Sequence, residues 1–195
     1  MRRRLGTIAA AAAGFIAATT PVHSAPPAQV STSRVPALLA VRRELGAPAA
    51  GVSDLKFHDI FKTPVGDKGL EPSAILLALD GKRVRMVGYM VRQQPAPTGV
   101  FLLSPLPAEI SDEDEPLADD LAPSIVAVEV TGAANRPIPP LPGLIQVTGV
   151  LHVGAKTDTA SGRVSAVQIA LDAAVAKSLL GTHSAPATPA RAGAR

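Results

Sequence analysis

The stretch RVRMVGYMV, residues 83–91, decides the fold. Val84, Met86, Gly88 and Met90 occupy every second position and alternate with Arg83, Arg85, Val87 and Tyr89. Residues that alternate in this way line opposite faces of a β-strand, so the pattern predicts a long strand with one face in a core. Gly88 lies inside this stretch, where a strand of a coiled barrel bends or bulges.

A second stretch, LIQVTGVLHV at 144–153, repeats this design with Gly149 at its centre. The polar segment 156–162 predicts a hairpin turn after it. Three further β-rich runs are 100–103, 125–130 and 163–171. Five strands within about 90 residues favour a closed arrangement that removes sheet edges. The sequence therefore predicts a mainly β domain, a single small five-stranded OB-like barrel. A β-sandwich is the alternative fold, although it usually needs about seven strands.

Short helices are expected to flank the barrel. Apolar residues at helical spacing predict one helix over 35–45, and others are expected over 72–79 and 172–180. The predicted domain therefore spans 35–181. Segments rich in Pro, Ser, Thr and Ala precede and follow it, and we expect a disordered linker at 26–34 and a disordered tail at 182–195.

Two parts of the chain resemble a known bacterial family. LDGKRVRMVGYMV at 79–91 and FLLSP at 101–105 resemble the first part of the family, and PGLIQVTG at 142–149 with the run 164–171 resembles the second. The family is the exported bacterial domain of unknown function 3299. The resemblance, which covers 79–172, implies a periplasmic protein with an OB-like core, in some genomes associated with transporter genes for metals or small molecules. It implies no established activity.

The first 25 residues predict a removable secretory signal peptide. Three arginines, Arg2 to Arg4, precede a short apolar run at 5–18, and small residues lead to a cleavage site after Ala25. We therefore expect export to the periplasm and no membrane span after cleavage. An uncleaved anchor is the alternative. The consecutive arginines leave both Sec and Tat export open.

Net charge and cysteine content exclude several kinds of chemistry. The chain has 19 basic and 16 acidic residues, and three of the basic residues lie in the leader, so the mature chain carries 16 of each. A neutral chain is not an electrostatic match for nucleic acid or an anionic membrane. The absence of cysteine excludes disulfides, thiolate metal ligands and a cysteine nucleophile.

The concentrated charge of the domain lies in an acidic segment at 109–120. Its carboxylates are Glu109, Asp112, Glu113, Asp114, Glu115, Asp119 and Asp120. Such a segment is typical of a solvated surface that faces a partner, and all seven are candidate partner-facing residues. Carboxylate oxygens also suit divalent cations, so Asp112, Asp114 and Asp119 are weak candidate metal ligands, although their spacing is not that of an EF-hand. In many relatives a segment with Cys and His occupies this place, and here it has neither.

No motif for catalysis or a cofactor is present. The domain has two histidines, His58 and His152, which are too few to form a zinc site by themselves. The aromatic residues of the predicted strands are Tyr89 and Phe101, which give nucleic acid little to stack on. We therefore expect a non-enzymatic binding protein of unknown ligand, without a cofactor or nucleic acid, that serves an envelope or transporter protein. A divalent-cation-binding protein and an unrecognised enzyme are the alternatives.

Overall fold

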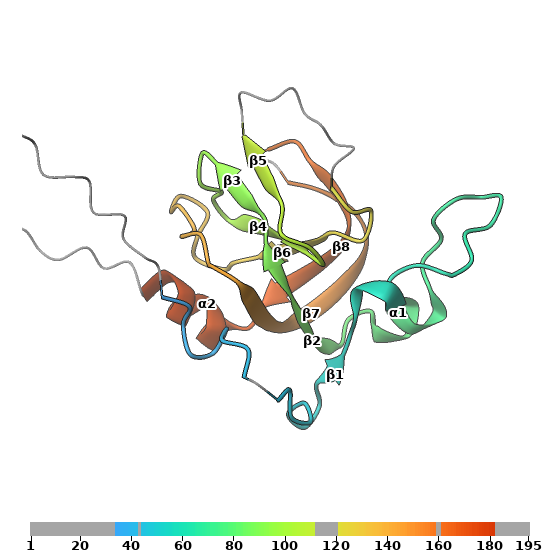
Figure 1. The fold of residues 1–195 in the computed structure, drawn as a ribbon, viewed down its shortest axis with the longest axis horizontal. Coiled ribbons are helices and arrows are strands. Elements are labelled where there is room, and N and C mark those ends of the chain that lie inside the picture. Colours follow the sequence, from blue (N-terminus) through green and yellow to red (C-terminus); the bar gives the residue numbers. More distant parts are fainter. Residues whose placement is uncertain (1–33, 43, 112–120, 159–160, 182–195) are drawn as a thin grey trace, which may run out of the picture. The chain divides into compact units, whose positions relative to one another are not determined.

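The structure is a computed structural model that describes residues 34–42, 44–111, 121–158 and 161–181 (Figure 1). All of these residues belong to one compact unit. The predicted leader 1–25 and tail 182–195 lie outside the described residues, and so does the predicted linker except for Arg34.

The described chain is mainly β, as predicted. Its strands are β1 (Ser53–Asp54), β2 (Arg83–Met90), β3 (Arg92–Gln94), β4 (Val100–Ser104), β5 (Glu109–Ser111), β6 (Val126–Glu129), β7 (Leu144–Thr157) and β8 (Val164–Leu171). Its helices are the 3-10 helix η1 (Phe57–Asp59) and the α-helices α1 (Ala74–Leu79) and α2 (Ala173–Gly181).

Five of the strands pair in a closed ring. The hydrogen-bonded order is β1-β2-β4-β6-β8-β7, and β7 also pairs with β2. The pairings within the ring are antiparallel except β6 with β8, which is parallel. These five strands correspond to the five that the sequence predicts, with ends that differ by a few residues at most, and each has a neighbour on both sides. β1 adds to β2 in parallel, at the level of Val84 and Arg85.

The main core fills the inside of this ring. Along β2 the even-numbered positions are buried and the odd-numbered ones face outward, as the alternation of residues 83–91 predicts. The large buried side chains include Met86 from β2, Phe101 from β4 and Ile169 from β8. A second, smaller core lies outside the ring and contains Val91, Leu102 and Ala127.

The small sheet of β3 and β5 is associated with this second core. Three residues of each strand pair in parallel, with Gln93 beside Ile110. Ile110 packs against the second core together with neighbours such as Leu121 and Ile125. This pair is not predictable from the sequence, because strands of three residues show too little alternation to be recognised.

Both strand glycines are required because the backbone of another strand lies too close to leave room for a Cβ atom. A Cβ built on Gly149 would lie 2.1 Å from the carbonyl oxygen of Ala170, and one on Gly88 would lie 2.7 Å from the carbonyl oxygen of Ser104. Gly149 pairs with both neighbouring strands at the point where β7 passes from β2 to β8. The bulge of β7 lies further along, between Val153 and Lys156, and not at this glycine.

The predictions for the two α-helices are confirmed. Ser73 begins α1, because its side chain accepts a hydrogen bond of 3.0 Å from the backbone N–H of Leu76. The segment expected at 172–180 forms α2, and Ala176 donates its N–H to the carbonyl of Asp172 at 2.9 Å. Neither helix in the described part of the chain has the length and apolarity that a membrane crossing requires.

The helix predicted over 35–45 is wrong. The chain makes a single turn after Pro36, and Ala40 then forms a β-bridge with Ile145 of β7. The carbonyl of Leu39 accepts a hydrogen bond of 2.8 Å from Gln146 N–H. Leu39 is fully buried, but Leu38 is half exposed, so the apolar spacing does not correspond to one buried helical face.

We call residues 34–42 and 44–55 the N-terminal strap. It runs along the lower side of the ring in the view of Figure 1 and ends in β1. Leu39, Val52 and Leu55 of the strap are buried, and the N–H of Leu55 donates to the carbonyl of Arg85 at 3.0 Å. The strap thus covers parts of β2 and β7 that the ring strands leave unpaired.

Candidate functional site

Most of the predicted acidic candidates lie outside the described residues. These are Asp112, Glu113, Asp114, Glu115, Asp119 and Asp120. Glu109 is described and belongs to β5. One of its oxygens accepts a 3.1 Å hydrogen bond from Gln94, and the other lies 3.9 Å from a guanidinium nitrogen of Arg92. Glu109 therefore helps to join β3 to β5, and both the partner-facing role and the cation site of the acidic segment stay predictions.

The two histidines are not part of a metal centre among the described residues, where no group of three or more His, Cys, Asp or Glu side chains is placed to hold an ion. His58 is exposed, and its Nε2 lies 3.3 Å from a carboxylate oxygen of its neighbour Asp59. His152 is exposed on β7.

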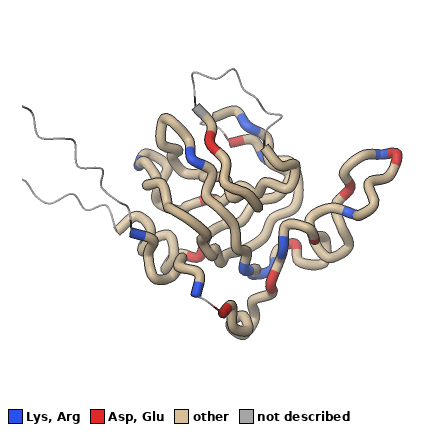
Figure 2. The backbone as a smooth tube through the Cα atoms, viewed as in Figure 1, with Lys and Arg blue, Asp and Glu red and all other residues tan. Residues whose placement is uncertain are grey.

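The arginines of β2 are both paired with carboxylates. Arg85 donates to the two oxygens of Asp54 at 2.6 and 2.8 Å, and it also donates to the carbonyl of Gly46 at 2.9 Å. The hydrogen bond from Arg85 lowers the pKa of the Asp54 carboxyl. Arg83 forms a second ion pair with Asp172, just before α2. Figure 2 shows that both basic and acidic positions are spread over the described chain.

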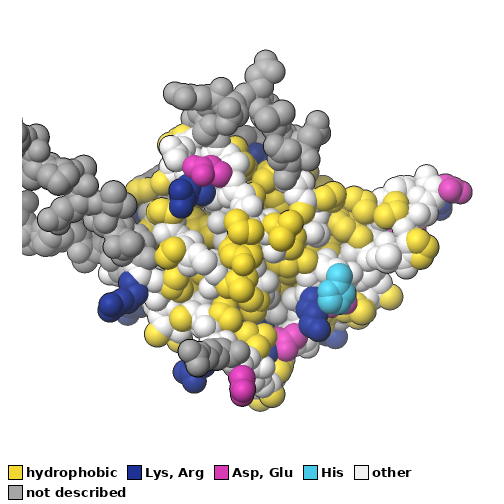
Figure 3. Space-filling view, in the orientation of Figure 1, with side chains coloured by type: hydrophobic (Ala, Val, Ile, Leu, Met, Phe, Trp, Pro, Cys, Tyr) yellow, Lys and Arg dark blue, Asp and Glu magenta, His cyan; other side chains and the backbone are white. Residues whose placement is uncertain are grey.

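A further surface feature lies between η1 and β2. Residues 61–72 form a projecting loop that is joined at its base by a bridge between Phe61 and Pro72. This loop and α1 carry exposed apolar side chains, and Figure 3 shows apolar side chains on this part of the molecule. They are Val65, Leu70, Ile75 and Leu77.

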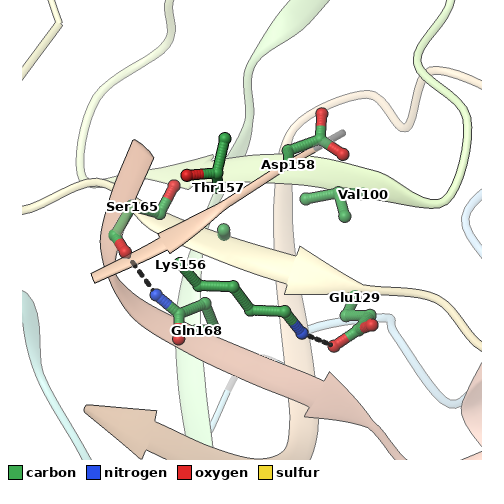
Figure 4. Close-up of a pocket in the computed structure, with 8 residues that line it drawn as sticks. Val100, Glu129, Lys156, Thr157, Asp158, Ser165 and Gln168 are labelled. Atoms are coloured by element: carbon green, nitrogen blue, oxygen red, sulfur yellow. Dashed lines mark hydrogen bonds and ion pairs between the residues drawn. The ribbon is translucent and has the colours of Figure 1, made fainter. Parts of the chain in front are cut away.

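A pocket of about 170 Å³ lies where the β7–β8 hairpin extends beyond the ring (Figure 4). The parallel pairing of β6 with β8 begins at Ala127 and Gln168, but β8 stays paired with β7 as far as Val164 and Thr157. The pocket is bounded by this projecting hairpin and by outward-facing residues of the ring. It is lined by Val100, Ala127, Glu129, Lys156, Thr157, Asp158, Ser165 and Gln168.

Gln168 fixes the bend of the hairpin. Its side chain is only 6% exposed, and its Nε2 donates to the carbonyl of Gly154 at 2.9 Å and to the carbonyl of Ser165. Gly154 lies in the bulge of β7 and has a φ of 142°, a conformation that favours glycine. The buried amide thus satisfies a carbonyl that the bulge leaves outside the regular ladder.

An ion pair crosses the pocket. Lys156, on the hairpin, donates to a carboxylate oxygen of Glu129, on β6, over 2.8 Å (Figure 4). The two side chains are 55% and 44% exposed. A pair this open to water contributes no more than about 1 kcal/mol, so it joins the hairpin to the ring weakly.

Asp158 stands at the turn of the hairpin. Its carboxylate accepts hydrogen bonds from the N–H and hydroxyl of Ser161 at 3.1 and 2.5 Å. Its backbone N–H donates to the carbonyl of Arg163 at 2.8 Å, which closes the turn. These bonds fix the carboxylate of Asp158 on the turn, and the residue also lines the pocket.

Sequence reasoning missed this pocket. Glu129 on β6 and Lys156 on β7 are 27 residues apart, and their strands lie on either side of β8, which pairs with both. The sequence predicts the hairpin turn at 156–162. How far the hairpin extends beyond the ring depends on where β6 ends. Single residues such as Gln168 gave no signal, because a glutamine in a strand resembles any solvent-facing polar residue.

The comparisons with known proteins give one structural similarity. No family model matches the chain, and no curated protein matches it. The chain is similar to the crystal structure of a DUF3299 family protein from Pseudomonas aeruginosa PAO1, with 15% sequence identity and a TM-score of 0.39. The alignment covers 65% of this chain and 94% of that one. That protein comes from the family that residues 79–172 resemble.

Proposed function

We propose that this chain is an exported, periplasmic, non-enzymatic binding protein that serves an envelope transport system. Its ring is an OB-like barrel, and it binds its ligand in the pocket under the β7–β8 hairpin. The export pattern of residues 1–25 supports the compartment.

The position of the pocket in the strand order carries the proposal. Counted along the chain, β4 and β6 are the second and third of the five ring strands, and the β7–β8 hairpin joins the fourth to the fifth. OB folds bind ligands on the face of strands 2 and 3 and through the loop between strands 4 and 5. The pocket has Val100 from β4, Ala127 from β6 and Thr157 from the hairpin among its lining residues, so it lies at this place.

The chemistry of the pocket suits binding. It combines two carboxylates, one ammonium and two hydroxyls with two apolar side chains. Polar side chains therefore outnumber apolar ones in this lining, which suits a ligand with polar or charged groups. The polar side chains are oriented by bonds to the chain itself, as Gln168 is by the carbonyl of Gly154. A site that is already oriented loses less entropy when a ligand binds.

The test compares two exported, tagged variants in a capture experiment from native envelope extract, followed by mass spectrometry of both proteins and small molecules. Thr157→Trp places a large side chain at the exposed mouth of the pocket. Lys82→Trp is the control, because it adds the same side chain at an exposed position outside the pocket. We expect wild type and Lys82→Trp to retain the same ligand or transporter subunit and Thr157→Trp to lose it. Equal capture by all three proteins would contradict a role for the pocket.

A further inference from the structure

We propose that the pocket binds an ammonium or guanidinium group on a short aliphatic stem. This inference rests on the proposed function, because it names the ligand class for the same pocket.

Hydrogen-bond acceptors dominate the lining. Gln168 has two amide hydrogens, and both are used by backbone carbonyls, of Gly154 and Ser165. These two carbonyls fix which end of the amide is nitrogen, so the atom that remains for a ligand is the oxygen. Glu129 and Asp158 add carboxylate oxygens, which accept only. A ligand that donates several hydrogen bonds therefore matches this lining.

The net charge of the lining also favours a cationic ligand. The charged residues of the lining are two carboxylates, Glu129 and Asp158, and one ammonium, Lys156, which is already paired with Glu129. The site carries one net negative charge, so a cation is attracted and an anion is repelled. A carboxylate ligand could reach Lys156 only beside the carboxylate of Glu129, which repels it.

Size and apolar surface define the rest of the ligand. A volume of about 170 Å³ is below the range of about 300–1,000 Å³ that is usual for complete cofactor or drug sites, so the pocket fits one group and its stem. Val100 and Ala127 supply apolar contact for methylene groups. Cationic groups on aliphatic stems bury the stem on such surface and keep the charge on polar atoms.

The side chain of Lys156 has the same chemistry as the proposed ligand. It places an ammonium, on a four-carbon stem, 2.8 Å from Glu129. The incoming cation thus competes with Lys156 for the same carboxylate. Because the internal pair is half exposed, it is weak enough to be displaced.

The experiment is an NMR titration of the exported protein with n-butylamine and n-butylguanidine, and with butyrate as the anionic counterpart of the same length. The backbone amides of Ala127 and Gln168 report on the pocket. We expect both cations to shift these signals and butyrate to leave them unchanged.

Three variants test the roles of the charged groups. Glu129→Gln removes the carboxylate and should weaken cation binding by about tenfold or more. Lys156→Met keeps an unbranched apolar side chain but removes the competing ammonium, and should tighten cation binding by up to about fivefold. Glu71→Gln is the control, because Glu71 forms an equally exposed pair with Lys62, at 3.2 Å, outside the pocket, and its loss should change nothing. Thermal unfolding of each variant confirms that it is folded.

The outcomes separate the ligand class from the proposed function. Binding of butyrate that Lys156→Met abolishes would overturn the cationic class but leave the pocket as the binding site. Failure of both cations to bind, while Thr157→Trp still abolishes capture from extract, would also overturn the ligand class alone. Failure of every probe together with unchanged capture by Thr157→Trp would overturn both proposals.

One further titration tests whether the cation belongs to a polypeptide or to a free small molecule. Capped tripeptides Gly-Lys-Gly and Gly-Arg-Gly are titrated beside the free amines. Binding at least about tenfold tighter than that of the free amines supports the class with a polypeptide as its source. Equal binding supports the class with a free small molecule.

Discussion

Two ion pairs join the ring to neighbouring segments of the same chain, and the two pairs differ in their exposure to solvent. On the strap side, Arg85 is only 10% exposed and makes a two-pronged bond to Asp54. On the hairpin side, Lys156 makes a single bond to Glu129, and both side chains are about half exposed. A guanidinium fork fixes geometry, whereas a solvated ammonium exchanges partners easily.

The strap side and the hairpin side also differ in the apolar side chains that they bury. Leu39 and Leu55 of the strap are almost completely buried beside the ring. On the hairpin side the buried lining residues are a small one, Ala127, and the amide Gln168, and a pocket remains beside them. The strap side is therefore the more tightly packed of the two, whereas the hairpin side leaves a pocket open.

We expect the largest loss of stability from a substitution at Gly149, which pairs with both β2 and β8. Gly149→Ala places a methyl group against the backbone of β8, where a Cβ would lie 2.1 Å from the carbonyl oxygen of Ala170. The strands must separate to accept it, so we expect a loss of about 3 kcal/mol or more in the free energy of unfolding. Urea denaturation measures this loss. Gly46→Ala, which meets nothing within 4 Å, is the control, and an equal cost for both would contradict the close-approach explanation.

Removal of an apolar strap residue should be the next most costly change. Leu39→Ala leaves a cavity between the strap and the ring and should cost about 3 kcal/mol. Leu38→Ala is the matched control, because Leu38 is half exposed, and it should cost less than about 0.5 kcal/mol. Thermal or urea unfolding distinguishes them. Similar costs would mean that the strap is not packed as described.

Loss of the guanidinium fork should have an intermediate effect. Arg85→Met leaves Asp54 and the carbonyl of Gly46 without their donor and should cost about 1–2 kcal/mol. Arg85→Lys should recover little, because an ammonium cannot make the fork. Arg92→Met is the control, since Arg92 is exposed and lies 3.9 Å from Glu109. If Arg85→Lys were as stable as wild type, charge alone would explain the pair.

The fork should also give the strap side a dependence on pH. Arg85 lowers the pKa of Asp54 in the folded state below its unfolded value of about 3.9. The stabilisation is therefore complete above that value and is lost as the pH falls through the lowered folded pKa. Urea midpoints between pH 7 and pH 3 should show wild type losing its advantage over Asp54→Asn in acid. A constant advantage across this range would exclude the linkage.

The smallest effect on stability should come from the hairpin side. Lys156→Met breaks a pair that water already screens, so its unfolding free energy should change by less than about 1 kcal/mol. Calorimetry at low and high salt measures the change. A cost equal to that of Arg85→Met would make the two sides equivalent and remove the contrast between them.

Much of the framework could be predicted from the sequence, because alternation is a local signal. The stretches 83–91 and 144–153 contain buried residues at every second position, and the five ring strands were all expected. The strap shows where local reasoning fails. Leu38 and Leu39 have helical spacing with later apolar residues, but β7 offers backbone partners that no local pattern reveals.

The candidate site depends on contacts that a sequence does not specify. Glu129, Lys156 and Gln168 lie on three different strands, and a register shift of one residue would place them on other faces. Only the acidic segment gave a strong compositional signal, and of its seven carboxylates the structure describes Glu109 alone.

The parallel pairing of β6 with β8 has a consequence for the order of folding. β8 is the last ring strand to be made, and it pairs with β6 on one side and β7 on the other. Until residues 164–171 leave the ribosome, both of those strands present unpaired edges to other chains. Because these contacts are distant in sequence, closure is slow compared with local hairpin formation. The interval before β8 arrives is therefore when the nascent chain is most exposed to aggregation and most in need of a chaperone.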